Sequence, residues 1–115
     1  MKAYEKLAVD FATALVEERW DDARKLLTPA LQKKYAASAL KSQLHEMFSG
    51  YAEGPVKRIH FDPEFSMEDW PAKKKGDIGW AYVSVEGDDF VEAVTLTICK
   101  SASELTIREI EWGRP

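Results

Sequence analysis

The sequence predicts an α+β fold in which N-terminal helices pack on a curved antiparallel sheet of about four strands. In the first half of the chain, apolar residues recur at steps of three and four, which is the spacing of one face of an α-helix. The second half is rich in β-branched and aromatic residues and is divided by turn signals, a pattern typical of strands. A chain of 115 residues can bury one core but is too short for two ordinary domains, so we expect a single domain over residues 1–115.

The helical half begins with a long amphipathic helix, expected over residues 2–19, because its charged residues lie on the side opposite its apolar ones. Asp21 is expected to cap a short second helix, since its side chain can accept hydrogen bonds from the free amides of the next turn. Thr28 followed by Pro29 indicates another N-cap and first helical position, and this helix is expected to continue through Tyr35.

The next helix is expected to start at Ser38 and to end at Gly50, a residue type that favours the left-handed conformation found at helix C-termini. The first strand follows over residues 56–61. Residues 62–77 contain two prolines, a glycine and a basic run, so they are predicted to form a long exposed loop.

Three further strands are expected as a meander over residues 78–86, 90–100 and 105–112. Residues 87–89 are Gly-Asp-Asp, a tight-turn sequence between the first two of these strands. The apolar residues of the last strand change phase near Arg108, which one extra residue in a β-bulge would explain. Because bulges bend sheets, we expect the sheet to be curved.

The long strand at 90–100 alternates large apolar residues with small or β-branched ones. The large residues are expected to face the helices. The other face carries little charge, whereas a sheet face that is open to water usually carries more, so we expect a second subunit to cover it in a homodimer. The residues expected at this interface are Val91, Ala93, Thr95 and Thr97.

The composition excludes several kinds of partner and site. The 20 acidic and 16 basic residues give a net charge of -4, which opposes the attraction to phosphate on which nonspecific nucleic-acid binding depends. A single cysteine, Cys99, cannot form an internal disulfide, and no apolar run is long enough for a signal peptide or a membrane span. We therefore expect a cytoplasmic protein with neither a nucleic-acid nor a membrane partner. The histidines lie at no metal-ligand spacing, so no metal or other cofactor is expected.

Several residues carry a resemblance that extends over nearly the whole chain. They are the helix-turn-helix segment 11–27 with Trp20, Asp22, Ala23 and Leu26-Leu27, the pair Thr28-Pro29, and the strand endings 80–83 and 107–112. In these residues and in the order of its elements, the sequence resembles the nuclear transport factor 2-like superfamily, whose cystatin-like α+β cone wraps a bent sheet around a long helix. The resemblance implies that fold. It implies no single function, because the superfamily includes isomerases, dehydratases, transport factors and toxin-immunity proteins.

Aromatic residues from both halves of the chain are the candidates for a ligand site. Trp80 and Tyr82 alternate on one face of a strand, and aromatic side chains in a concavity supply apolar area together with a polar group. The alternative is that these residues fill the core of a small domain. His60 could act as a general base near neutral pH, or it could be a surface histidine without a role. The predicted ligand-binding residues are Phe11, Phe48, Tyr51, His60, Trp80 and Tyr82.

Two classes of function follow from these features. The first is a non-enzymatic domain that binds a small apolar ligand or another protein. The alternative is an isomerase-like or dehydratase-like enzyme that acts on a hydrophobic molecule in the cone, or a toxin-immunity protein. The resemblance implies that such an enzyme pairs a carboxylate or histidine base with a tyrosine donor inside the cone, and no residue is assigned that role here. An enzyme is expected to bury an ionisable group beside a cavity, whereas an interaction domain can have a filled interior.

Overall fold

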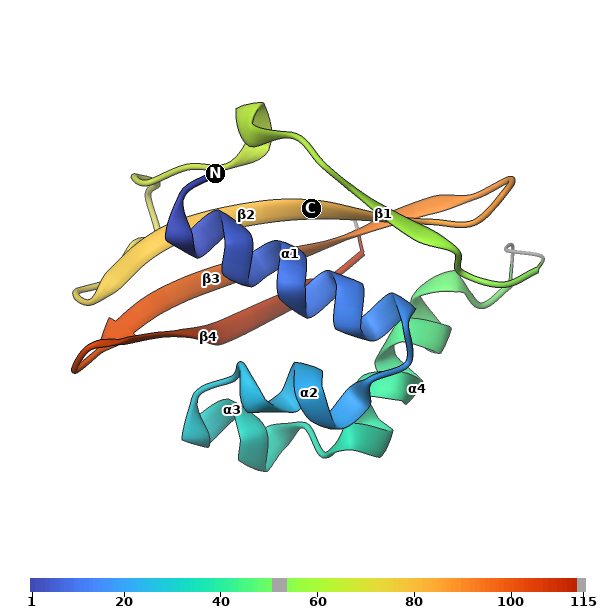
Figure 1. Cartoon of the computed structure of the whole chain (residues 1–115), viewed down its shortest axis with the longest axis horizontal. Helices are drawn as coiled ribbons and strands as arrows, with labels where there is room; N and C mark the ends of the chain where they lie inside the picture. The colour runs from blue at the N-terminus through green and yellow to red at the C-terminus, as the bar shows by residue number, and fades with distance from the viewer. Residues whose placement is uncertain (51–53, 114–115) are drawn as a thin grey trace.

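The computed structural model describes residues 1–50 and 54–113. In this part of the chain, helices come first and a four-stranded antiparallel sheet follows (Figure 1). The predicted fold class and the predicted order of elements are therefore confirmed. None of the helices in the described residues is both long enough and apolar enough to cross a membrane.

Two helix caps were predicted in the helical half, and the structure contains one of them. Thr28 caps the third helix, since its Oγ1 accepts a hydrogen bond from the Leu31 amide at 3.2 Å. The prediction that Asp21 caps the second helix is wrong. After Glu18, whose backbone is left-handed, the chain re-enters a helix so early that Arg19 occupies the cap position and Asp21 lies in the first turn. The helices are α1 (Ala3–Val16), α2 (Trp20–Lys25), α3 (Pro29–Lys34) and α4 (Ala37–Phe48).

The strands form a meander in which sequence neighbours are also neighbours in the sheet, in the order β1-β2-β3-β4. Residues 62–76 are exposed for the most part, as predicted for a loop, but they are not structureless. They contain the short helix η1 (Pro63–Phe65), and Met67 then exchanges two backbone hydrogen bonds of 2.8 Å with Trp80 of β2. The strands are β1 (Arg58–Phe61), β2 (Asp77–Glu86), β3 (Val91–Ser101) and β4 (Glu104–Trp112).

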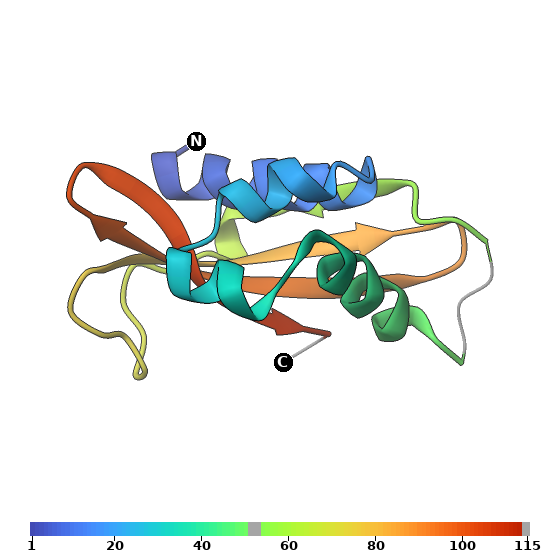
Figure 2. The ribbon, with the colours of Figure 1, turned by 90° about the horizontal axis from the view of Figure 1, so that it is seen from below.

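Two bulges bend the sheet at one end. In β4 the pairing shifts so that Arg108 is an extra residue, which confirms the predicted bulge. In β2 a second shift leaves Ile78 unpaired between Asp77 and Gly79. The two bulges lie on either side of the same stretch of β3, and bulges increase local bending and twist. Figure 2 shows the hairpin end of β3 and β4 turning toward the N-terminal end of α1.

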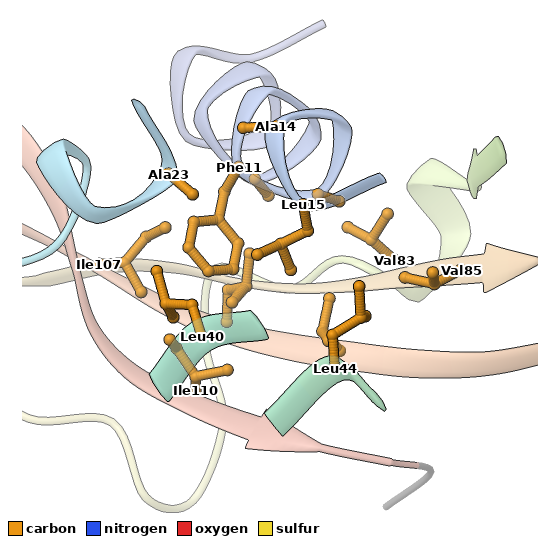
Figure 3. Packing of buried hydrophobic residues seen from close by; sticks show 14 of the residues in the cluster. Phe11, Ala14, Leu15, Ala23, Leu40, Leu44, Val83, Val85, Ile107 and Ile110 are labelled. Carbon is orange, nitrogen blue, oxygen red and sulfur yellow. The ribbon is translucent and has the colours of Figure 1, made fainter. Parts of the chain in front are cut away.

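The core lies between the helices and one face of the sheet, which we call the inner face. Figure 3 shows Phe11 and Leu15 of α1 packed with Leu44 of α4 and Val83 of β2, all of which are buried. The predicted inward direction of the large residues of β3 is confirmed, because three of them belong to this core. They are Val94, Leu96 and Ile98.

Gly79 marks the closest approach of a helix to the sheet. The Tyr4 ring at the start of α1 lies directly on the Gly79 backbone, so that a Cβ at this position would overlap the ring. The next inner-face residue of β2 is Ala81, which is also buried. Small residues are therefore required where α1 crosses β2, and the large residues of this part of β2 point to the other face, which we call the outer face.

Candidate functional site

Of the six residues that were predicted to line one pocket, the structure describes five and separates them. Phe11 is fully buried in the core and offers no surface to a ligand. Phe48 is buried at the end of α4, where its ring meets that of Phe90 edge-on with 4.8 Å between centroids. Tyr51 lies outside the described residues.

Trp80, Tyr82 and His60 lie on the outer face, so the prediction that they share a pocket with Phe11 and Phe48 is wrong. The physical reason is the alternation of β2. Its inner face carries the small and β-branched side chains that the approach of α1 allows, so its aromatic side chains point away from the helices. His60 is exposed and is paired with Ser84 on the adjacent strand.

An apolar cluster forms on the outer face around the two aromatic residues of β2. The Phe65 ring lies 5.7 Å from that of Tyr82, and Met67 shares a face with Trp80 because the two are directly opposite in an antiparallel pair. Phe65 is 56% exposed and Met67 is 40% exposed, the largest values for large hydrophobic residues in the described chain after Met1. We call these four residues the outer-face cluster.

The residues predicted at the subunit interface lie beneath the surface of this face. Ala93 and Thr97 are buried, and Thr95 is only 2% exposed within a single chain. Taller side chains on the flanking strands shield them, and the Thr95 hydroxyl donates a hydrogen bond of 3.4 Å to Glu111. A partner on the outer face would therefore meet the outer-face cluster rather than this row. Val91, the fourth predicted residue, is half-buried.

A buried ion pair connects the two bulges across the outer face. The Arg108 guanidinium donates two hydrogen bonds of 2.6 Å to the Asp77 carboxylate, which also accepts the Lys74 amide at 2.8 Å. The Asp77 side chain is 1% exposed and that of Arg108 is 22% exposed. The hydrogen bonds from Arg108 lower the pKa of Asp77 below its usual value and outweigh the opposing effect of burial.

A second buried carboxylate ties the N-terminus of α1 to the 62–76 segment. Burial opposes the ionisation of Glu5, but hydrogen bonds from the Lys2 amide at 2.8 Å and the Ser66 hydroxyl at 2.7 Å prevail and lower its pKa. Lys2 also forms an ion pair with Glu68. These contacts hold the segment that presents Phe65 and Met67 on the sheet edge.

A pocket of about 390 Å³ opens at the other end of α1, against the end of α4. Its volume lies in the range of small-molecule sites, roughly 300–1,000 Å³. Polar and apolar atoms contribute about equally to its surface, and Glu18, His45 and Ser49 are its described polar side chains. The apolar lining includes Leu15, Trp20, Leu44, Phe48, Val56 and Phe90.

Of the predicted ligand-binding residues, Phe48 alone lines this pocket in the described part of the chain. Phe90 and Glu18 line the pocket but were not predicted as site residues. Phe90 follows a turn and Glu18 follows the end of a helix, so no periodic pattern connects them. Phe65 and Met67 were missed because they lie in a segment read as a loop. Within residues 1–50 and 54–113, no three histidine, cysteine, aspartate or glutamate side chains gather closely enough to hold a metal ion.

Comparisons of the chain with protein-family models, with curated proteins and with solved structures find no match.

Proposed function

We propose that the chain is a non-enzymatic interaction domain of the nuclear transport factor 2-like type that forms a homodimer through its outer sheet face. The observation that carries this proposal is the outer-face cluster. Two of its four members are more than one third exposed, and the described helices pack on the opposite face of the sheet. Contiguous apolar surface of this kind typically marks an interaction site.

The shape of the outer face suits a second copy of the chain. Strands about 4.8 Å apart, rising about 3.4 Å per residue, give this face a projected area of roughly 600 Å², to which side-chain relief adds. A stable interface buries about 800 Å² on each partner. The outer face is therefore close to the size that a dimer requires.

The charges of the outer face also favour a second copy. Glu109 and Glu111 are exposed and lie on β4, two strands away from the aromatic residues of β2. A two-fold axis that runs along β2 would bring the clusters of two copies together and keep the glutamates of the two copies apart. An isologous interface needs this kind of self-complementarity.

The states of the two buried carboxylates support binding rather than catalysis. Glu5 and Asp77 are both held by several hydrogen bonds that join elements of the fold, and neither lines the pocket. A general acid or base needs a carboxyl group that can exchange a proton with a substrate beside a cavity. An enzyme of the isomerase or dehydratase type and a toxin-immunity protein are the alternatives to the proposal.

The homodimer is tested by sedimentation equilibrium of the chain and of Phe65→Lys. The wild type is expected to have about twice the 13.1 kDa mass of one chain at micromolar concentrations. Phe65→Lys is expected to be monomeric, because it places a charge in the centre of the interface, and to fold normally, because Phe65 is more than half exposed. Ala30→Lys on α3, which adds the same charge at an exposed position of the helical layer, should remain dimeric. A monomeric wild type would refute the proposal.

A second capacity, the binding of a small molecule, is favoured by a different observation. The pocket at the end of α1 has the volume of a ligand site, aromatic and aliphatic side chains form part of its lining, and it lies on the side of the sheet away from the outer-face cluster. We propose that it holds a small ligand with an apolar body.

A further inference from the structure

The charged side chains that line the pocket indicate which class of ligand it binds. Glu18 is the only carboxylate among the described lining residues, and these include neither lysine nor arginine. Its carboxylate makes no ion pair or hydrogen bond with the described residues, whereas the neighbouring Glu17 pairs with Arg19 at 2.8 Å. Within residues 1–50 and 54–113, no cation therefore pairs with the carboxylate of Glu18.

Glu18 also occupies a backbone conformation that favours glycine. Its φ is 60°, in the left-handed region, which costs a residue with a side chain roughly 1–2 kcal/mol. The conformation closes the C-terminus of α1, where the Glu18 amide donates to the Leu15 carbonyl at 3.1 Å and the Arg19 amide donates to the Ala14 carbonyl at 2.8 Å. This C-cap therefore fixes the backbone of Glu18 beside the pocket that the residue lines.

Aromatic rings provide the second half of a cation site. Trp20, Phe48 and Phe90 all line the pocket, and the last two are in ring contact. An ammonium group near the face of an aromatic ring is attracted by the ring quadrupole, most strongly for tryptophan. A carboxylate beside aromatic rings thus forms a surface suited to an organic cation.

From these contacts we infer that the pocket binds an organic ammonium ion with an apolar, ring-sized body, and that Glu18 and Trp20 hold its charged end. This inference rests on the proposed small-molecule binding and specifies the class of ligand. A pocket without a charge preference would instead bind a neutral molecule of the same shape equally well.

A series of three probes tests the inference: 3-phenylpropylammonium, 3-phenylpropanol and 3-phenylpropanoate. They share one apolar body and differ in charge. Binding is measured by protein-observed NMR titration at about pH 8. We expect the ammonium probe to bind about tenfold more tightly than the alcohol, a difference of about 1.4 kcal/mol, and the carboxylate to bind most weakly. The shifted signals should include those of Leu44 and Phe48.

Two matched variants show whether Glu18 is responsible. Glu18→Gln should reduce the preference for the ammonium over the alcohol to about twofold or less, since it removes the charge and keeps the shape. Glu17→Gln, one residue away but outside the pocket lining, should leave the preference unchanged. Both residues are exposed, so both variants are expected to fold.

Each result has a distinct meaning. Equal binding of the ammonium and the alcohol at the pocket would overturn the cation class and leave small-molecule binding intact. A preference that persists in Glu18→Gln, or that maps to residues outside the pocket, would also overturn the inference. If none of the three probes shifts the pocket signals at millimolar concentration, both the inference and the proposed small-molecule binding fail.

Discussion

Replacement of Arg108 by methionine should reveal how strongly the two bulges are held together. The substitution keeps much of the aliphatic length but removes the two hydrogen bonds that Arg108 donates to Asp77. The Asp77 side chain is 1% exposed, and it would keep one hydrogen bond, from the Lys74 amide. Breaking a buried ion pair by removing one partner costs about 3–5 kcal/mol. Because Arg108 is 22% exposed, solvent screens part of the interaction, and we expect a loss of about 2–3 kcal/mol.

The assay for Arg108→Met is urea denaturation at pH 7, with Asp77→Asn as the companion variant. A loss of 2–3 kcal/mol in the free energy of unfolding would also appear in a thermal melt, as a decrease in melting temperature of roughly 8–15 °C for a domain of this size. Asp77→Asn should cost less, since the Arg108 guanidinium that it leaves unpaired can reach water. A loss below about 1 kcal/mol in Arg108→Met would refute the view that this ion pair supports the bent end of the sheet.

The pH dependence of the same variant provides a second check. The folded-state pKa of Asp77 lies below its unfolded value, so the ion pair contributes fully above the unfolded pKa of about 3.9 and is lost as the pH falls through the folded pKa. In Arg108→Met the donors that lower this pKa are gone and burial raises it. The difference in unfolding free energy between wild type and variant should therefore narrow as the pH falls from 7 toward 3. A constant difference would contradict the assignment.

Three further substitutions test separate parts of the structure. Gly79→Ala should lower the free energy of unfolding by about 2–3 kcal/mol, since the new methyl group overlaps the Tyr4 ring. In a double-mutant cycle with Tyr4→Leu, the combined loss should be smaller than the sum of the two single losses. Thr28→Ala should cost about 1 kcal/mol by removing the cap of α3, as measured by thermal unfolding. Glu18→Gly should raise stability by about 0.5–1 kcal/mol, because it relieves the left-handed strain, and a loss of stability would contradict the strain at this position.

The phase change at Arg108 shows what the sequence could predict about the sheet. Apolar alternation reports which face a residue occupies, so an extra residue within a strand appears as a break in that alternation. The same reasoning missed the bulge at Ile78. That bulge lies at the first residues of β2, where too few strand residues precede it for a break to be visible.

The direction of Trp80 and Tyr82 could not be read from the strand itself. Both possible faces of β2 are apolar, and the larger residues were assigned to the interior. The direction is set at Gly79, which must face α1 because the Tyr4 ring leaves no room there for a larger side chain. A contact between residues 4 and 79 is a tertiary constraint, and periodicity within one strand does not encode it.

The two candidate sites were beyond sequence reasoning for a related reason. The outer-face cluster combines β2 with a segment that exchanges hydrogen bonds with the sheet edge after an excursion through η1. The pocket combines a helix end, a second helix and the turn before β3. Residue types and spacing identified Phe48, Trp80 and Tyr82 as candidates, but the grouping of residues into sites depends on the fold.

The central claim, that a second copy covers the outer-face cluster, is tested most directly by the solvent accessibility of Trp80. The relaxation of the indole Nε1–H signals by a soluble paramagnetic agent can be compared in the wild type and in Phe65→Lys by NMR. We predict that Trp80 is shielded in the wild type and becomes accessible in the variant, while Trp20, which lies in the helical layer, is equally accessible in both. Equal relaxation of Trp80 in the two proteins would contradict the account.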